Sequence, residues 1–127
     1  MNGQQKKTQR IELGRWGEGI ALDYLLAQGF SLLKKNYRTP DGEIDLIMKK
    51  DEDLVFVEVK TRKNTEFSLP EESISEEKLD HLEASAGWYL EENPEYEKNW
   101  RLDVITVIGI PNGNKPQVDW FENVTGA

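Results

Sequence analysis

The feature that most constrains the fold is a pair of β-prone segments, residues 42–48 and 54–60, separated by the polar residues 50–53. Two such runs joined by a short polar turn predict a β-hairpin. A loop of two residues and a loop of four residues give the same pairing register, in which Asp45 faces Glu58. A loop of three residues would shift the pairing by one position and scatter the charged side chains between the two faces.

One face of this hairpin collects charged side chains. Because side chains alternate between the faces of a strand, Glu43 and Lys60 lie opposite each other on the same face as Asp45 and Glu58. Two directly opposed carboxylates destabilise a sheet unless a cation compensates them. Carboxylate oxygens in a chain with no cysteine and one histidine favour a hard divalent ion such as Mg²⁺ or Mn²⁺. The other face is apolar and is predicted to be the core: Ile44, Leu46, Met48, Val55, Val57 and Val59.

The composition is typical of one soluble globular domain. The chain has 127 residues, of which 37% are apolar and 31% charged, and this length suits a single domain with one core. No apolar run approaches the roughly 18 residues of a membrane span, and the polar, basic start of the chain lacks the apolar segment of a secretory signal. We therefore expect a flexible basic arm over residues 1–10, a single domain over residues 11–127, no membrane association and a cytoplasmic location.

The net charge of −8 argues against a nucleic-acid partner, but the charges are unevenly distributed. Residues 1–63 carry 12 Lys or Arg and 10 Asp or Glu, whereas residues 64–127 carry 4 and 14. Several acids of the first half belong to the predicted site, and basic residues surround them: Arg15, Lys34, Lys35, Arg38, Arg62 and Lys63. A basic rim around an acidic centre suits a metal-dependent enzyme that acts on a phosphodiester. The alternative from charge alone is a solvated surface of mixed charge.

Residues 12–28 have apolar side chains at three- and four-residue steps, which predicts a helix that ends at Gly29. Glu18 falls at the edge of the apolar arc, where a carboxylate needs a partner. That partner is either a basic residue such as Arg15, in a salt bridge, or a metal ion at the hairpin site.

The remaining elements complete an α/β pattern: strands at 30–37, 101–110 and 117–124, a polar loop at 64–72 and a second helix at 75–92. Ser75 is a suitable N-cap for that helix. Lys78, in its first turn, faces either solvent or the acidic site. The order of helix, strand, hairpin, helix and two strands predicts an α/β fold with a mixed β-sheet of about five strands, flanked by two main helices.

The hairpin carries an acid on one strand and the sequence Glu58-Val59-Lys60 on the next, which is the pattern of the PD-(D/E)xK nucleases. More specifically, the chain resembles the YraN-like family of uncharacterised bacterial proteins (uncharacterised protein family 0102), regarded as predicted endonucleases distantly related to Holliday junction resolvases. The resemblance covers about residues 14–108 and implies a restriction-endonuclease-like core. Its marks are Gly14, Gly17-Glu18, Ala21, Gly29-Phe30, Asn36-Tyr37-Arg38, residues 42–47, residues 56–62, Lys78 and residues 101–104.

The resemblance implies roles for four residues of the hairpin. Asp45 and Glu58 would bind a Mg²⁺ or Mn²⁺ ion, with the carbonyl of Val59 as a third ligand. Lys60 would steady the attacking water or the transition state.

Two further acids, Glu18 and Glu43, would be accessory metal ligands. The chain departs from the superfamily in one respect, because the Pro-Asp dipeptide that precedes the second motif is replaced here by Ile44-Asp45. A literal Pro40-Asp41 lies in the preceding turn, where the predicted pairing places it away from Glu58. We therefore assign the ligand role to Asp45.

These observations favour a metal-dependent endonuclease that hydrolyses phosphodiester bonds in DNA. The resemblance implies that the cleavage leaves a 5′-phosphate, and it extends the candidate substrates to branched DNA and repair intermediates. The expected partner is nucleic acid, and since resolvase-like enzymes are often dimers, a homodimer is compatible with the resemblance. Five basic residues are candidates for binding the nucleic acid: Arg15, Arg38, Arg62, Lys63 and Lys78.

Two alternatives come from other functional classes. The first is a nucleic-acid-binding module with the same fold that does not cleave. The second is an acidic protein-interaction domain in which the carboxylates form structural salt bridges, an alternative that the acidic second half of the chain supports.

Overall fold

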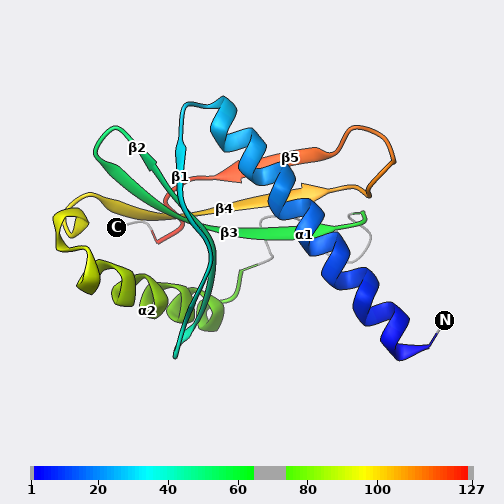
Figure 1. The fold of residues 1–127 in the computed structure, drawn as a ribbon, viewed down its shortest axis with the longest axis horizontal. Helices are drawn as coiled ribbons and strands as arrows, with labels where there is room; N and C mark the ends of the chain where they lie inside the picture. The colour runs from blue at the N-terminus through cyan, green and yellow to red at the C-terminus, as the bar shows by residue number, and fades with distance from the viewer. Residues whose placement is uncertain (1, 65–73, 126–127) are drawn as a thin grey trace.

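The computed structural model describes residues 2–64 and 74–125, which form a five-stranded sheet with two main helices (Figure 1). In chain order the elements are α1 (Gly3–Ala27), β1 (Ser31–Thr39), β2 (Gly42–Lys50), β3 (Asp53–Arg62), α2 (Glu76–Glu92), the short 3₁₀ helix η2 (Pro94–Tyr96), β4 (Trp100–Ile108) and β5 (Gln117–Phe121). The strands lie in chain order, and β3 and β4 form the one parallel pair among them. The prediction of an α/β fold with a mixed five-stranded sheet and two main helices is confirmed.

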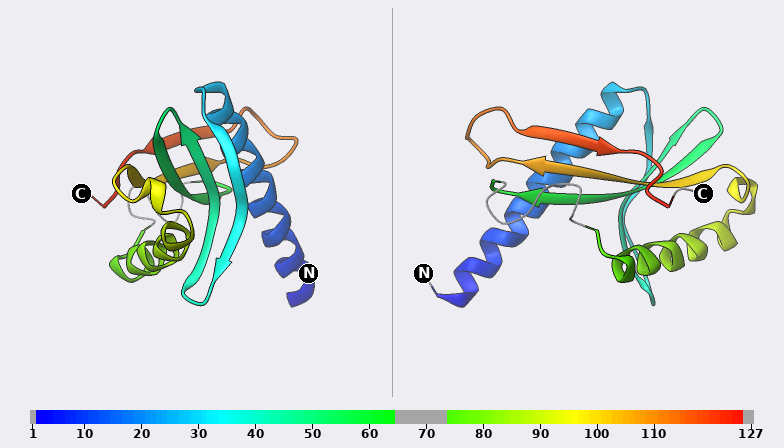
Figure 2. Two further views of the ribbon diagram at one scale, coloured as in Figure 1. Left: turned by 60° about the vertical axis from the view of Figure 1, so that its left-hand side comes forward. Right: turned by 180° about the vertical axis from the view of Figure 1, so that it is seen from behind.

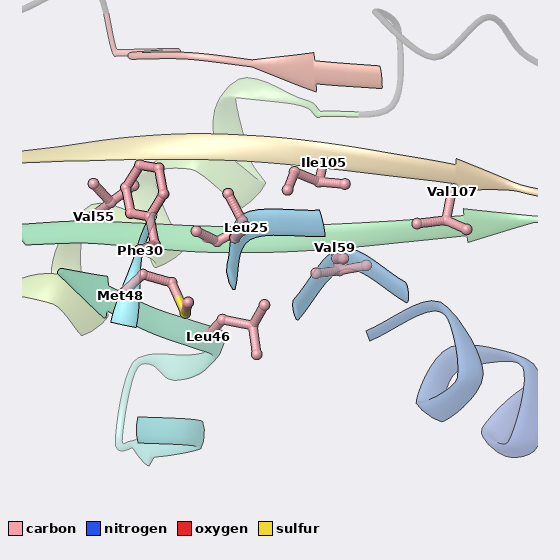
Figure 3. Packing of buried hydrophobic residues seen from close by; sticks show 10 residues of the cluster. Leu25, Phe30, Leu46, Met48, Val55, Val59, Ile105 and Val107 are labelled. Carbon is pink, nitrogen blue, oxygen red and sulfur yellow. The ribbon is translucent and has the colours of Figure 1, made fainter. Parts of the chain in front are cut away.

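The sheet is buried on both faces, because α1 and α2 cover opposite sides of it (Figure 2). Along β3, Val55 and Val57 pack under α1, whereas Leu54 and Phe56 pack under α2. Figure 3 shows the core on the α1 side, with Leu25 of α1 lying over the strands. Our prediction of one apolar face on the hairpin was therefore incomplete, since the helix in the β3–β4 crossover buries a second apolar face.

The start of β2 does not follow the predicted alternation. Ile44 packs in the core under α2, although strict alternation placed it with Leu46 on the α1 side. β2 pairs with β3 only from Leu46 onward, and the tip of the β1–β2 hairpin bends toward α2 (Figure 1). α2 holds this tip, since Trp88 Nε1 donates a hydrogen bond to Asp41 Oδ2 at 2.8 Å. Because β2 separates from β3 here and curves toward α2, the side chain of Ile44 enters the core under α2 and not the core under α1.

The register of the β2–β3 pair is as predicted from Leu46 to Lys50, but the predicted opposition of Glu43 and Lys60 was wrong, because the pairing ends at Leu46 and Glu43 pairs with Arg38 of β1 instead. Leu46 lies opposite Val57, and Lys50 lies opposite Asp53 at the turn. This register places Asp45 beside Glu58, which is the pairing that the candidate site requires.

α1 begins at Gly3, well before the predicted start of the helix at residue 12. Residues 3–10, which we expected to be a flexible arm, form its first turns. A capping box explains the early start: Gln5 N donates to Asn2 Oδ1 at 2.9 Å, and Asn2 N donates to Gln5 Oε1 at 3.0 Å. These bonds satisfy backbone donors that would otherwise be unpaired at a helix start. Among the described helices, none has the length and apolar character needed to cross a membrane.

α2 matches the predicted second helix, and Ser75 is its N-cap, with Oγ accepting from Lys78 N at 3.1 Å. The predicted loop at 64–72 lies outside the described residues except for residue 64.

α1 lies directly on β3 at Gly17. A Cβ atom at this position would overlap Thr61 Oγ1 and would lie 2.8 Å from Thr61 Cβ. The absence of a side chain at Gly17 therefore allows the close approach of helix and sheet, and it brings the next residue, Glu18, to the edge of the sheet.

We expect Gly17→Ala to destabilise the protein by about 1–3 kcal/mol, because the added methyl group overpacks the contact with Thr61. Gly19→Ala is the matched control, since a Cβ there meets nothing within 4 Å and alanine favours the helix by up to about 1 kcal/mol. Urea unfolding of both variants measures the difference. Equal changes in the free energy of unfolding would show that Gly17 is not a packing requirement.

Candidate active site

The candidate site forms where β2 separates from β3. Backbone pairing between the two strands ends at Leu46 and Val57. Beyond this point the Asp45 side chain takes the place of the β2 backbone, and its Oδ2 accepts a hydrogen bond from the Val59 N–H at 2.8 Å. The carboxyl groups of Asp45 and Glu58 interact with each other across this opening.

Glu58 is buried in the middle of the sheet, with 5% of its surface exposed. Lys78 of α2 approaches it, with Nζ 3.4 Å from Glu58 Oε2. Among the described residues, however, none donates a hydrogen bond to this buried oxygen. A buried carboxylate oxygen without a hydrogen bond is costly, so a bound cation would stabilise it.

The pKa of Asp45 is raised from its ordinary value of 3.8 to about 8. Burial is the main cause, because it removes water from the charged form, and the neighbouring Glu58 carboxylate adds to it. The Val59 N–H and the Lys78 ammonium act in the opposite direction. In the metal-free protein, the pair formed by Asp45 and Glu58 therefore retains a proton near neutral pH, which relieves the repulsion between the two neighbouring acids.

Glu18 of α1 completes an acidic cluster with Asp45 and Glu43. Burial and the charges of Asp45 and Glu43 raise the pKa of Glu18 from 4.5 to about 7. The Asn36 side-chain amide lies between two of these acids, and with its nitrogen turned toward them it donates to Glu18 Oε1 and Glu43 Oε1, each at 3.0 Å. Asn36 thus links the accessory acids and fixes their positions relative to the strand.

A pocket of about 620 Å³ opens in front of the carboxylates, between the middle of α1 and the end of β3. The predicted residues Glu18, Asp45, Glu58, Val59 and Lys60 all line it. The structure therefore brings the three predicted catalytic residues and four of the five predicted metal ligands to one cavity. Glu43, the fifth predicted ligand, is not among the lining residues, although the Asn36 amide links it to Glu18.

The predicted nucleic-acid-binding residues divide into two groups. Arg62 and Lys63 line the pocket, and Lys78 approaches Glu58 from α2. Arg15 and Arg38 do not line it. Arg38 is 85% exposed and lies 4.0 Å from Glu43, measured from Nε to Oε2.

The donor set of the site fits a magnesium-type ion. No group of three or more Asp, Glu, His or Cys close enough to form a metal cage occurs in the described parts of the chain. Mg²⁺ does not require such a cage, because it commonly binds one or two carboxylates and completes its coordination with water and substrate phosphate. Asp45, the unsatisfied oxygen of Glu58 and the Val59 carbonyl are suitable oxygen ligands of this kind.

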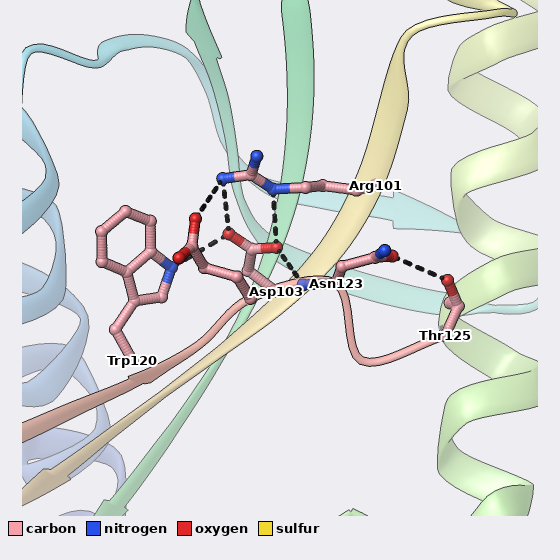
Figure 4. Close-up of polar contacts among 6 residues, drawn as sticks. Arg101, Asp103, Trp120, Asn123 and Thr125 are labelled. Carbon is pink, nitrogen blue, oxygen red and sulfur yellow. Dashed lines mark hydrogen bonds and ion pairs between the residues drawn. The ribbon is translucent and has the colours of Figure 1, made fainter. Parts of the chain in front are cut away.

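A second buried acid, Asp103 of β4, has a different environment (Figure 4). Arg101 donates to both of its oxygens, from Nε at 3.0 Å and from Nη2 at 3.2 Å. Trp120 Nε1 and Asn123 N each donate a further bond, both at 2.9 Å. These donors satisfy both carboxylate oxygens of Asp103, so Asp103 is not a candidate metal ligand. Its bonds to Trp120 and Asn123 instead join β4 to the C-terminal segment. Asp45 and Glu58 lack this compensation.

Sequence reasoning missed two residues of the site. Arg10 lines the pocket, although we placed it in a flexible arm. Asn36 was noticed only as part of the family resemblance, yet it has a positive φ of 50° within β1. An asparagine in an otherwise β-prone segment was the available signal, since asparagine is depleted in strands and tolerates positive φ.

The raised pKa values predict how the stability of the metal-free protein depends on pH. Asp45 and Glu18 keep their protons in the folded state up to about pH 8 and 7, whereas the unfolded chain releases them near pH 4. The folded state therefore binds more protons across this window, and the free energy of unfolding should fall as pH rises from about 4 to 8 and then level off. Urea denaturation in EDTA at several pH values between 5 and 9 measures this dependence of the free energy of unfolding on pH. Asp45→Asn should flatten the curve, whereas the exposed control Asp23→Asn should not. Stability that rises between pH 5 and 8 would contradict the assignment.

The sequence matches the family model described as uncharacterised protein family UPF0102 over residues 17–107. It is 41% identical over 113 residues to a UPF0102 protein of Syntrophotalea carbinolica, an alignment that covers 89% of this chain and 90% of that protein. It is 43% identical over 96 residues to a UPF0102 protein of Clostridioides difficile, covering 76% of this chain and 84% of the relative. A UPF0102 protein of Syntrophomonas wolfei is 41% identical over 97 residues, covering 76% and 84%. The chain therefore belongs to the uncharacterised protein family UPF0102.

Proposed function

We propose that this protein is a metal-dependent endonuclease that hydrolyses phosphodiester bonds in DNA. The observation that carries the proposal is the pairing of Asp45 with Glu58 at a pocket, where a buried oxygen of Glu58 receives no hydrogen bond from the described residues. Lys60 lines the same pocket, two residues along β3. Two acids and a lysine in this arrangement suit the cleavage of a phosphate ester better than a purely structural role, because structural acids are paired as Asp103 is.

Asp45, Glu58 and the Val59 carbonyl would hold the ion. When bound, Mg²⁺ or Mn²⁺ lowers the pKa of a coordinated water and neutralises charge on the scissile phosphate. The Val59 N–H fixes one oxygen of Asp45, so the carboxylate keeps its orientation toward the pocket. Because the ion replaces the proton on Asp45, its binding should tighten as pH rises.

Lys60 contributes a positive charge next to the ion site. An ammonium group there stabilises the negative charge that develops on the phosphate during attack. Glu18 lines the same pocket from α1, and its raised pKa suits a group that accepts a proton near neutral pH. The proposed product carries a 5′-phosphate.

The direct test incubates purified protein with branched, nicked, duplex and single-stranded DNA, with Mg²⁺, with Mn²⁺ and with EDTA. We expect cleavage that requires the metal and is lost in Lys60→Ala. Cleavage that survives both Lys60→Ala and Asp45→Ala would refute the proposal. Salt-sensitive binding of DNA without metal-dependent cleavage would instead support the non-cleaving nucleic-acid-binding module.

Lys78 is expected to compete with the metal ion for Glu58. Its ammonium lies 3.4 Å from Glu58 Oε2, and a contact of this kind is worth roughly 1–2 kcal/mol at a partly exposed site. Lys78→Gln should therefore tighten Mn²⁺ binding about tenfold, as measured by calorimetry or by the electron paramagnetic resonance of free Mn²⁺. The exposed control Lys98→Gln should leave it unchanged. Weaker Mn²⁺ binding by Lys78→Gln would show that Lys78 supports the ion instead of competing with it.

A further inference from the structure

α1 is longer than the part of the sheet that it covers. Its 25 residues span about 37 Å, and Figure 1 shows its N-terminal turns running past the end of β3. The buried residues of α1 are Gly17, Ala21 and Leu25, all in its C-terminal half. Residues 2–12 are all exposed. We call residues 3–12 the overhang of α1.

A groove connects this overhang to the candidate active site. The pocket at the carboxylates adjoins a second pocket of about 470 Å³ along the overhang. Arg10, Leu13 and Lys63 line both pockets, so the two form one continuous depression that follows α1 away from Asp45 and Glu58.

The outer part of this groove is basic. The second pocket is lined by Lys6, Arg10 and Lys63 among its charged residues, and no acid is among the described residues that line it. Arg62 and Lys60 continue the positive charge inward to the carboxylates. In a chain with a net charge of −8, such a row of cations is not explained by composition.

The position of the cations on the helix indicates an anionic partner. At 100° per residue, Lys6, Arg10 and Leu13 fall on the same stripe as Gly17, which packs against Thr61 of β3. This stripe would normally be apolar if protein covered it. On the overhang it carries mainly cations, so its partner should be a polyanion and not another apolar surface.

The spacing suits the backbone of a DNA strand. Arg10 and Lys6 lie 8 and 12 positions before Glu18, which corresponds to about 12 and 18 Å along the helix. Each phosphate of one strand advances about 3.4 Å along a duplex axis. The two cations therefore reach phosphates up to about five nucleotides from the acidic end of the groove.

We infer that the overhang of α1 is a DNA-binding arm, in which Lys6 and Arg10, together with Lys63, bind backbone phosphates that flank the scissile bond. This inference rests on DNA being the substrate of the proposed nuclease. It assigns a role to Lys6 and Arg10, which have none in the proposed metal site. The helical structure of the arm would favour binding, because a preformed helix holds the two cations in place and avoids the entropic cost of ordering a flexible segment.

The test measures binding of a fluorescent duplex to the full-length protein in Ca²⁺, across a series of salt concentrations. The double variant Lys6→Gln/Arg10→Gln should reduce the slope of log affinity against log salt by about 2 and weaken binding roughly 10- to 100-fold near 0.1 M salt. The matched control is Lys7→Gln/Lys98→Gln, which removes the same charge. Lys7 is adjacent to Lys6 but lines neither pocket of the groove. Gln is a good helix former, and circular dichroism verifies that both variants fold.

The outcomes separate the arm from the nuclease. A smaller slope of log affinity against log salt in Lys6→Gln/Arg10→Gln, with the slope of the control variant unchanged, supports the arm. This holds whether or not the wild-type protein cleaves DNA. Equal losses in both double variants would reduce the effect to net charge and overturn the inference. Cleavage of DNA by the wild-type protein, with the slope unchanged in Lys6→Gln/Arg10→Gln, would overturn the arm and leave the proposed function intact. A wild-type protein that does not bind DNA at all would overturn the arm directly.

Discussion

Replacing Asp45 with asparagine should reduce metal-dependent cleavage of DNA at least about 1,000-fold and should at the same time stabilise the metal-free protein. The loss of activity follows because an amide is a poor ligand for a hard divalent ion, and about 4 kcal/mol of transition-state stabilisation corresponds to this factor. The gain in stability follows because asparagine can still accept the Val59 N–H, while it removes one of two neighbouring buried acids. We expect a gain of roughly 1–2 kcal/mol at pH 8, since active sites commonly trade stability for function.

The matched control is Asp41→Asn. Asp41 belongs to the literal Pro-Asp dipeptide but lies at the hairpin tip, where it accepts a hydrogen bond from Trp88. Single-turnover cleavage and urea unfolding in EDTA, measured on both variants, test the pair of effects. If cleavage is lost in Asp41→Asn and kept in Asp45→Asn, then Asp41 and not Asp45 is the metal ligand.

Asp103→Ala is expected to cost about 3–5 kcal/mol of folding free energy. Removing one partner of a buried ion pair leaves the other uncompensated, and Arg101, Trp120 and the Asn123 N–H would all lose their acceptor. Marginal stability makes a loss of this size close to the total for a domain of this length.

The control for Asp103 is Asp119→Ala on β5, whose carboxylate accepts a side-chain bond from Gln117 at 2.8 Å. We expect less than about 1 kcal/mol there. If Asp103→Ala does not fold, Asp103→Asn keeps the volume and should still lose about 2 kcal/mol. A loss below about 1 kcal/mol for both Asp103 variants would mean that Asp103 is not essential for holding β4 to the C-terminal segment.

The geometry of the hairpin could be predicted because it depends on local rules. A charged turn between two apolar runs fixes the register from Lys50 back to Leu46, and this register brings Asp45, the next residue of β2, close to Glu58. The position of Lys60 on the same strand follows from alternation. The N-cap of α2 at Ser75 was predictable for the same reason, because its hydrogen bond spans three residues.

The parts that could not be predicted depend on contacts between distant segments. Ile44 changes cores because the hairpin bends toward α2, and no pattern in the strand indicates that bend. The overhang of α1 has no apolar stripe, so helical periodicity did not extend over it. The hydrogen bonds to Asp103 come from residues about 20 positions away along the chain. From the sequence alone, Asp103 therefore cannot be distinguished from a catalytic acid.

The contact of Gly17 with Thr61 has a consequence for protein engineering. Since Glu18 is the next residue, the separation of α1 from the sheet also sets the reach of its carboxyl group into the pocket. A larger residue at 17 would withdraw that acid together with the backbone, so the two positions cannot be varied independently. Altering the ion preference of the proposed nuclease should therefore start on an unchanged glycine, where Glu18→Asp changes the length of the side chain and Glu18→Gln changes its charge.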